Sequence, residues 1–208
     1  MAGLLEKVER RLGEKLFIKG DRCLGPKCAV ARRAYPPGAH GKKRTRKRET
    51  SGFGALLAEK QKMRFLYGLD DKDIERYSKE ASLRKGIYSS ILLRMLEERL
   101  DNVVFRLGFA YSRRSARQLI VHCHVTVNGI TARAPSRALR KGDAVSLKER
   151  FLKSPAFAHI ADYLKKCEAP QWLSLDKAKK AGIMREHPEG GDIGILIDAA
   201  KIKEFYSR

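Results

Sequence analysis

The stretch that decides the fold runs from Arg99 to Gly129 and reads RLDNVVFRLGFAYSRRSARQLIVHCHVTVNG. It continues a series of apolar residues that recur at the spacing of one helix face, namely Leu96, Leu100, Val103, Val104 and Leu107. Gly108 follows the series directly, and glycine commonly ends a helix. We therefore expect one amphipathic helix at about residues 89–107.

A second helix and a hairpin complete the stretch. Ser112 is a favourable N-cap residue, and a helix at about 113–123 places three apolar residues on one face, Ala116, Leu119 and Ile120. Val125–Val127 alternates as a strand does, and Asn128-Gly129 is a strong signal for a tight hairpin turn. The chain is expected to return as a partner strand from Ile130 onward.

The short helix also carries three arginines on the face beside its apolar one, Arg113, Arg114 and Arg117. A guanidinium can donate to two phosphate oxygens at once, so the cluster favours phosphate binding. A solvated basic face without a ligand is the alternative that this pattern alone leaves open.

The first 54 residues form a Pro/Gly-rich arm in which turn residues come too often for long helices. Residues 15–18 are expected to make a short strand or one helical turn. At 42–48 six of seven residues are basic, and such a run repels itself unless a counter-charge orders it. We interpret it as a strand that orders against phosphates; a solvated or targeting tail is the alternative.

The other expected elements are mostly helical. One helix is expected at 55–69, and a second runs from an Asp70 N-cap to about Ala81. The turn Lys141-Gly142-Asp143 precedes a strand, Ala144–Leu147. Further along the chain we expect helices at 155–167 and 174–181, a strand-like run at 193–197 and a final helix at 198–208.

Charge narrows the function. The 208 residues include 45 Lys+Arg and 24 Asp+Glu, a formal charge of +21, of which residues 1–50 alone carry +10. Such a surplus repels itself and is usually tolerated because a polyanion neutralises it. No apolar run approaches the roughly 20 residues that span a bilayer. The four cysteines do not indicate a disulfide framework, and we expect a soluble cytoplasmic protein.

Known catalytic patterns are missing from the sequence, among them the nucleophile elbow, the P-loop and the dinucleotide glycine motif. Asp70-Asp71 begins a helix and Asp101 belongs to a helix stripe, so neither suggests an acid–base pair. We expect that the chain is not an enzyme.

A family resemblance sharpens this expectation. Segments 99–109, 112–119 and 125–129 resemble the RNA-binding module named after the fourth protein of the small ribosomal subunit. That module also occurs in some pseudouridine synthases, a tyrosyl-tRNA synthetase and a heat-shock protein. The flanking segments are similar to the bacterial ribosomal family itself: YPPGAHG at 35–41, EKQK at 59–62, YG at 67–68, WLSLD at 172–176 and EFYSR at 204–208.

The resemblance implies an α+β fold. Residues 1–89, completed by a C-terminal helix at 198–208, would form a helical basic domain. Residues 90–197 would form an inserted domain with the RNA-binding module at about 97–148. The implied function is that of a structural constituent of the small ribosomal subunit, a primary binder of small-subunit rRNA. It would nucleate assembly of the subunit body and contribute to translational accuracy in the cytoplasmic ribosome.

The implied partners are small-subunit rRNA, the fifth small-subunit protein, the third and twelfth proteins, and messenger RNA near the path by which it enters. No membrane partner is implied. The expected RNA contacts are Arg32, Arg33, Arg44, Arg46, Lys47, Arg48, Lys60, Lys62, Arg64, Arg113, Arg114 and Arg117. Tyr35 and His40 either stack on RNA or hydrogen-bond to it, or they pack the turn that holds them.

Cys23 and Cys28 raise the question of zinc. Some members of the family bind zinc with four cysteines, and the places of the first pair hold Glu6 and Glu9 here. Because thiolates and imidazoles dominate structural zinc sites, we favour no metal and no cofactor and keep zinc on Cys23 and Cys28 as the alternative. The side chains of His122-Cys123-His124 are expected to diverge at a helix end and to pack or contact phosphate.

Two rival functions use the same module. An RNA-modifying enzyme would need a catalytic domain, for which 208 residues leave no room beside the module and the basic region. A ribosome-recycling or stress factor would be shorter and would lack the terminal FYSR.

Overall fold

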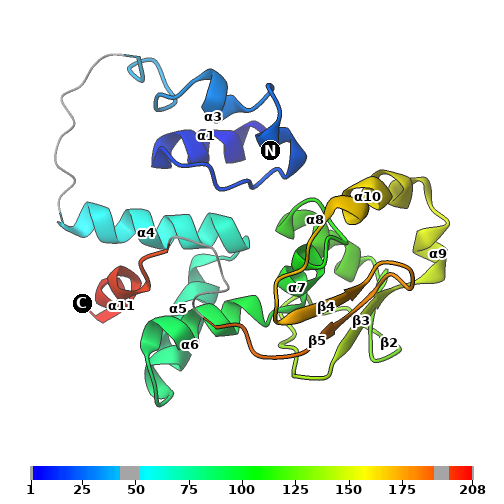
Figure 1. The fold of residues 1–208 in the computed structure, drawn as a ribbon. Helices are drawn as coiled ribbons and strands as arrows, with labels where there is room; N and C mark the ends of the chain where they lie inside the picture. Colours follow the sequence, from blue (N-terminus) through cyan, green and yellow to red (C-terminus); the bar gives the residue numbers. More distant parts are fainter. Residues whose placement is uncertain (1, 43–51, 190–196, 208) are drawn as a thin grey trace. The chain divides into compact units, whose positions relative to one another are not determined.

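The chain is described by a computed structural model over residues 2–42, 52–189 and 197–207 (Figure 1). Its contacts divide into two units, Met1–Leu83 with Leu196–Arg208, and Arg84–Ile195. Helices together with a five-stranded antiparallel sheet confirm the α+β class. The expected domain bounds, 1–89 with 198–208 and 90–197, stay a prediction. Within the described ranges, no helix has the length and apolar character needed to cross a membrane.

The first unit begins with a helix that sequence reasoning missed. Helix α1 (Ala2–Leu12) fits entirely before the first positive-φ glycine, Gly13, so the frequency of turns in the arm does not limit it. Two short helices follow, α2 (Asp21–Leu24) and α3 (Ala29–Arg32). The expectation of a strand or helical turn at 15–18 is wrong.

The loop after α1 is shaped by a buried carboxylate. Oε1 of Glu9 accepts hydrogen bonds from the backbone N–H groups of Leu16 and Ile18, at 3.1 and 3.2 Å. These donors are therefore used by a side chain, and they are not free for a strand ladder or a helical turn.

Three longer helices complete the first unit. Helices α4 (Gly52–Tyr67) and α5 (Asp71–Leu83) confirm the two helices expected on either side of Asp70. Helix α11 (Ala199–Ser207) packs on both of them (Figure 1). Their shared interior is apolar, with Met63, Ile74 and Ile202 each fully buried.

The second unit begins with two helices where one was expected. Helix α6 (Tyr88–Glu97) ends before Arg99, and α7 (Leu100–Arg106) begins after it. Arg99 has extended backbone angles and forms a β-bridge with Ala138. The expected continuous helix at 89–107 is therefore wrong, because backbone pairing with a distant segment breaks it. The apolar stripe is nevertheless buried as expected.

Helix α8 (Arg113–Val121) and the hairpin after it confirm the expected order. Oγ of Ser112 accepts from the N–H of Ser115 and so caps α8. Strands β1 (Val125–Val127) and β2 (Ile130–Thr131) pair across Asn128-Gly129. Both turn residues have positive φ, as the tightest hairpin turn requires.

The sheet has the order β2-β1-β3-β5-β4, with every neighbouring pair antiparallel. Strand β3 (Ala144–Leu147) and helix α10 (Pro155–Lys166) confirm expectations, and a short helix α9 (Glu149–Leu152) lies between them. The expected helix at 174–181 is wrong. That segment forms β4 (Leu173–Asp176) and the start of β5 (Ala181–Met184), whose pairing with β3 overrides the local pattern. The expected run at 193–197 lies outside the described residues except for Ile197, which is in no strand.

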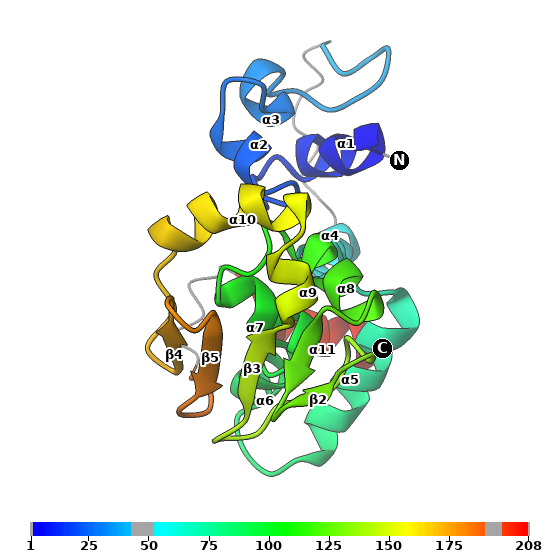
Figure 2. The same cartoon turned by 90° about the vertical axis from the view of Figure 1, so that its right-hand side faces the viewer.

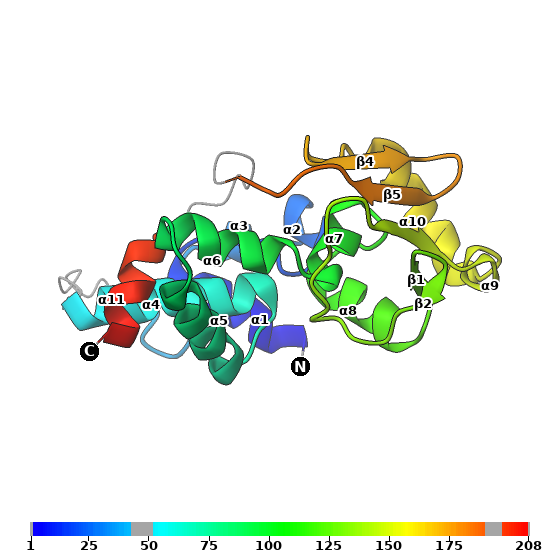
Figure 3. The same cartoon turned by 90° about the horizontal axis from the view of Figure 1, so that it is seen from below.

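The core of the second unit joins helices to the sheet (Figures 2 and 3). Side chains of α7, α8, α9 and α10 meet those of β1, β3, β4 and β5 in one buried cluster. The Arg-rich helix α8 is therefore anchored by its apolar face, and its other faces are left for polar contacts.

Candidate nucleic-acid interface

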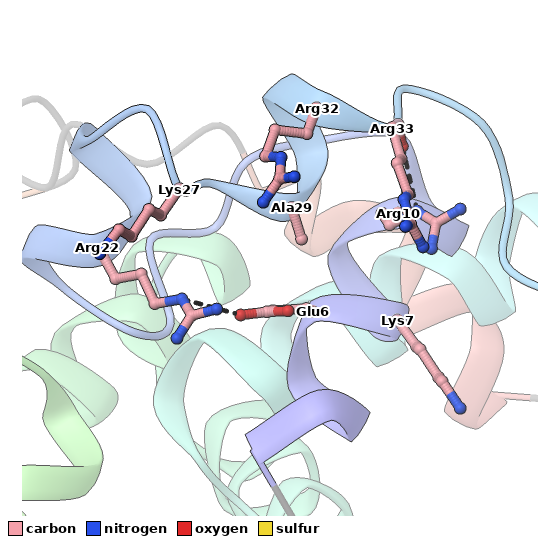
Figure 4. Close-up of a pocket in the computed structure, with 8 residues that line it drawn as sticks. All are labelled: Glu6, Lys7, Arg10, Arg22, Lys27, Ala29, Arg32 and Arg33. Atoms are coloured by element: carbon pink, nitrogen blue, oxygen red, sulfur yellow. Dashed lines mark hydrogen bonds and ion pairs between the residues drawn. The ribbon is translucent and has the colours of Figure 1, made fainter.

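A basic pocket lies among helices α1, α2 and α3 (Figure 4). Its volume is about 260 Å³, and its lining residues are Glu6, Lys7, Arg10, Arg22, Lys27, Ala29, Arg32 and Arg33. Six of these eight side chains carry a positive charge at neutral pH. Figure 4 shows Arg22 reaching toward Glu6, while Arg32 and Lys27 extend from the α2–α3 side of the pocket.

Arg10 lines the pocket and fixes the chain on one side of it. Its Nε donates to the backbone carbonyl oxygens of Arg33 and Tyr35, at 3.0 and 3.1 Å. Its guanidinium also lies over the ring of Tyr35, 4.9 Å from the centroid. The contacts fix the segment that follows α3, and they give Tyr35 a packing role in the turn, one of its expected roles.

Glu6 is the single carboxylate of the pocket, and it is already neutralised. It accepts from Nζ of Lys19 at 2.6 Å, and Nε of Arg22 lies 3.2 Å away. The hydrogen bond from Lys19 holds the pKa of Glu6 below its usual value, and the charges of Lys19 and Arg22 add to this effect. Glu6 therefore stays ionised at neutral pH and cancels little of the remaining positive charge.

Four cations of the pocket have no hydrogen bond or ion pair from their side chains to any other described residue: Lys7, Lys27, Arg32 and Arg33. All four are exposed. A concave surface with several uncompensated cations attracts a phosphate-bearing ligand. The structure thus brings the expected pair Arg32 and Arg33 together with Lys7 and Lys27, which sequence reasoning missed. Had α1 been predicted, the three-residue spacing of Lys7 and Arg10 would have placed both cations on the same face of one helix.

The expected RNA contacts on α4 are engaged inside the first unit. Nζ of Lys60 lies 2.9 Å from Oδ1 of Asp71 and 4.9 Å from the ring centroid of Phe205. Nζ of Lys62 lies 2.6 Å from Oε2 of Glu14. Both lysines are buried, which leaves their ammonium groups little access to a ligand.

Arg64 shares the carboxylate of Asp71 with Lys60, at 2.9 Å from Oδ2. The hydrogen bond from Lys60 lowers the pKa of Asp71, with the charge of Arg64 acting in the same direction. Asp71 is thereby tied to a structural ion pair at the start of α5. Its partners give it no role in acid–base chemistry.

In the module, the three arginines of α8 differ. Nε of Arg113 donates to Oδ1 of Asn102 at 2.7 Å, and its guanidinium lies 4.6 Å from the ring centroid of Phe105. Its side chain is only 11% exposed. Arg114 and Arg117 are exposed. Arg113 therefore faces the helix packed beside it, and the expected RNA contact of all three arginines stays a prediction.

The remaining expected contacts, Arg44, Arg46, Lys47 and Arg48, lie outside the described residues, as does most of the basic run 42–48. Lys42 is described, and its ammonium lies 5.9 Å from the ring centroid of Tyr35. The run therefore starts at the segment that Arg10 fixes beside the pocket.

The two cysteines of the N-terminal arm are free thiols, buried to 4% and 3% exposure at Cys23 and Cys28. Burial raises the pKa of Cys23, so its thiol stays protonated at neutral pH. Across the described ranges, no three His, Cys, Asp or Glu side chains are grouped to hold a metal. Glu6 and Glu9, at the places of the missing cysteine pair, bond instead to the surrounding chain.

His122 and His124 do not diverge, contrary to expectation. Their rings are near-parallel, with centroids 6.2 Å apart. Cys123 between them has a φ of 62°, and the tight turn that it forms brings the two rings next to each other.

Comparison with known proteins agrees with the geometry. Residues 3–97 match the model of the ribosomal protein S4/S9 N-terminal domain, and residues 98–145 match the S4 domain. The chain is 45% identical to small ribosomal subunit protein uS4 of Syntrophomonas wolfei, over 96% of this chain and 94% of the relative. It is 43% identical to uS4 of Thermus thermophilus and 47% identical to uS4 of Desulfitobacterium hafniense, with the same coverage. The chain therefore belongs to the uS4 family of small ribosomal subunit proteins.

Proposed function

We propose that this chain is a structural constituent of the small ribosomal subunit that binds small-subunit rRNA directly and early. The family is one of ribosomal structural proteins and not of enzymes, and its place is the ribosome in the cytoplasm. The observation that carries the proposal is the pocket of α1–α3, where six cations surround one neutralised carboxylate.

The chemistry of this surface suits the backbone of folded RNA. Lysine and arginine contacts to phosphates position a protein on RNA without reading its sequence. Structured RNA is recognised largely by shape and backbone, so cations placed on fixed helices are the parts that such binding needs. Helix α8 is held in place by its buried face, and α1 by the hydrogen bonds of Glu9 and Arg10 to the chain that follows it, so both present such cations at fixed positions.

The contact set that we propose combines four exposed cations of the pocket and two of α8 with four cations of the basic run, which lie outside the described residues. It consists of Lys7, Lys27, Arg32, Arg33, Arg44, Arg46, Lys47, Arg48, Arg114 and Arg117. Lys60, Lys62, Arg64 and Arg113 are engaged inside their own units, and we assign them first to holding the fold.

We extend the proposal to a role in assembly of the subunit and to further binding partners. Early binding of rRNA would let the chain nucleate the subunit body and, through it, affect translational accuracy. The proposed protein partners are the fifth small-subunit protein and, further, the third and twelfth. Messenger RNA near its point of entrance is the proposed second RNA. Support for these partners comes from the family alone.

Binding of the full chain to small-subunit rRNA, measured over a range of salt concentrations, tests the central claim. The double variant Arg32→Ala/Arg33→Ala removes two pocket cations. Lys165→Ala/Lys166→Ala removes two exposed cations from α10 and serves as the control with equal net charge. We expect the pocket variant to bind more weakly and its salt slope to fall by about 2, roughly one unit per lost phosphate contact.

The control should behave as the unaltered chain does. Equal losses in both variants would show that net charge alone attracts the RNA, and a flat salt dependence would contradict the proposal altogether. Turnover of uridine to its isomer by the chain would instead favour the RNA-modifying rival.

A further inference from the structure

We propose that the rings of His122, His124 and Phe151 form a platform on which an unpaired base of RNA stacks. The proposal rests on the RNA binding proposed above and names a contact of a different chemical kind, which is a base face and not a phosphate. It concerns the second unit only.

The three rings form a ladder. His124 lies between the other two, with its centroid 4.8 Å from that of Phe151 at an interplanar angle of 26°. The His122 ring continues the series, 6.2 Å from His124 at 24°. Near-parallel rings at such spacings are typical of aromatic stacking.

The ladder is closed at one end and open at the other. Phe151 is 3% exposed, and the ring of Phe157 meets it edge-on at 6.0 Å. His122 is exposed at the opposite end, and no further described ring stacks on it. Only the His122 end can therefore accept another flat ring.

The backbone holds the ladder rigidly. Cys123, at a φ of 62°, forms a tight turn in which its N–H donates to the carbonyl of Ile120 at 2.9 Å. The backbone N–H of His124 donates to the carbonyl of Leu119 at 3.0 Å. The backbone carbonyl of His124 accepts from the backbone N–H of Lys148 at 2.9 Å. Stacking on such a surface costs little ordering entropy, because the rings are already in place.

The charges near the ladder favour a nucleotide as the occupant. Lys148 and Arg150 are close enough to His124 to lower its pKa, after the larger effect of burial. Neither side chain has a hydrogen bond or ion pair among the described residues. Glu149 is exposed between them and offsets part of this charge. An aromatic ring flanked by cations provides a stacking face for a base and counter-charges for its phosphates.

Three single variants of the full chain separate stacking from other roles of His122. His122→Ala removes the outer ring. His122→Phe keeps a ring but removes the imidazole nitrogens. Val121→Ala trims the neighbouring exposed side chain and is the control outside the ladder. Both positions are exposed, so all three variants should melt as the unaltered chain does, which thermal unfolding verifies.

The probes are a single-stranded oligoadenylate and an abasic oligomer with the same sugar-phosphate backbone. We expect His122→Ala to weaken oligoadenylate binding about fivefold or more, from the loss of one stacked base. His122→Phe and Val121→Ala should bind as the unaltered chain does. Binding of the abasic oligomer should not change in any variant.

Several results would overturn the platform. Equal loss in His122→Ala and His122→Phe, on both probes, would show that the imidazole contacts phosphate. No change in His122→Ala, or no preference of the unaltered chain for oligoadenylate over the abasic oligomer, would show that the rings only pack. Binding of small-subunit rRNA by the unaltered chain, measured in the same buffer, separates these failures from failure of the proposed function.

Discussion

The guanidinium of Arg113 donates from Nε to the side-chain carbonyl oxygen of Asn102 at 2.7 Å, and so ties α8 to α7. The amide nitrogen of Asn102 in turn donates to Oε2 of Glu97 at 2.6 Å, at the end of α6. The carboxylate of Glu97 is fully buried and also accepts from Nε of Arg106 at 3.0 Å. A polar network of this kind fixes the three helices that lead into the module, because each buried polar group depends on its partners.

Arg113 and Arg117 lie one helical turn apart on α8, and we expect opposite effects from removing them. Arg113→Ala should lower the free energy of unfolding by about 1.5–3 kcal/mol, because a hydrogen bond to a charged, part-buried group is lost. Arg117→Ala should leave stability nearly unchanged and reduce the salt slope of rRNA binding by about 1. Chemical denaturation and rRNA titration of both variants check this. Equal RNA loss at unchanged stability in both would show that Arg113 is a contact residue after all.

The two arginines also show what the sequence could predict. The spacing of apolar residues correctly gave the buried face of α8, and Ser112 and Asn128-Gly129 correctly gave its cap and the hairpin. Spacing alone does not say which of several neighbouring arginines meets a buried carboxylate. Glu97 is that carboxylate, and its position depends on how α6 meets α7.

Non-local pairing explains the other failures. The break between α6 and α7 exists because Arg99 pairs with Ala138, a residue 39 positions away. The helix expected at 174–181 is replaced by strands because β5 pairs with β3, the strand next to it in the sheet. Lys7 and Lys27 were missed in the candidate site because the pocket depends on how α1 and α3 pack, which no local pattern encodes.

Gly108 and Gly129 provide a matched pair of substitutions. Both have positive φ, 76° and 79°. A Cβ at Gly108 would lie 2.7 Å from Cβ and Sγ of Cys167, whereas a Cβ at Gly129 would meet nothing within 4 Å. Gly129→Ala should cost about 1–2 kcal/mol from backbone strain alone. Gly108→Ala should cost clearly more, because overpacking adds about 1–3 kcal/mol. Equal costs in urea denaturation would show that Cys167 moves aside freely.

The pH dependence of stability should carry a signature of His124. Burial lowers the pKa of its imidazole below the ordinary 6.5, with smaller effects from the charges of His122, Lys148 and Arg150. The unfolded chain then binds this proton more tightly than the folded chain does. Stability is therefore greatest above about pH 6.5 and decreases as the pH falls from there through the folded pKa.

His124→Phe should remove this decrease, while the exposed His40→Gln should leave it in place. The measurement is the free energy of unfolding between about pH 5 and 8, the range in which an ordinary histidine changes charge. Carboxylates with lowered pKa values, such as Glu6, affect stability only in more acidic solution. A decrease that survives in His124→Phe would assign it to another group.

A buried carboxylate holds the N-terminal arm in shape. The buried carboxylate of Glu9 accepts from two backbone N–H groups of the loop after α1, those of Leu16 and Ile18. Glu9→Ala should destabilise the first unit by about 2 kcal/mol, because one buried and one part-buried N–H group lose their charged acceptor. A chelator should leave the melting temperature of the unaltered chain unchanged, since these hydrogen bonds already close the loop next to Cys23 and Cys28. A melting temperature that falls with chelator, together with zinc in elemental analysis of the untreated protein, would instead establish the two thiols as metal ligands, because a structural metal contributes its binding energy to folding.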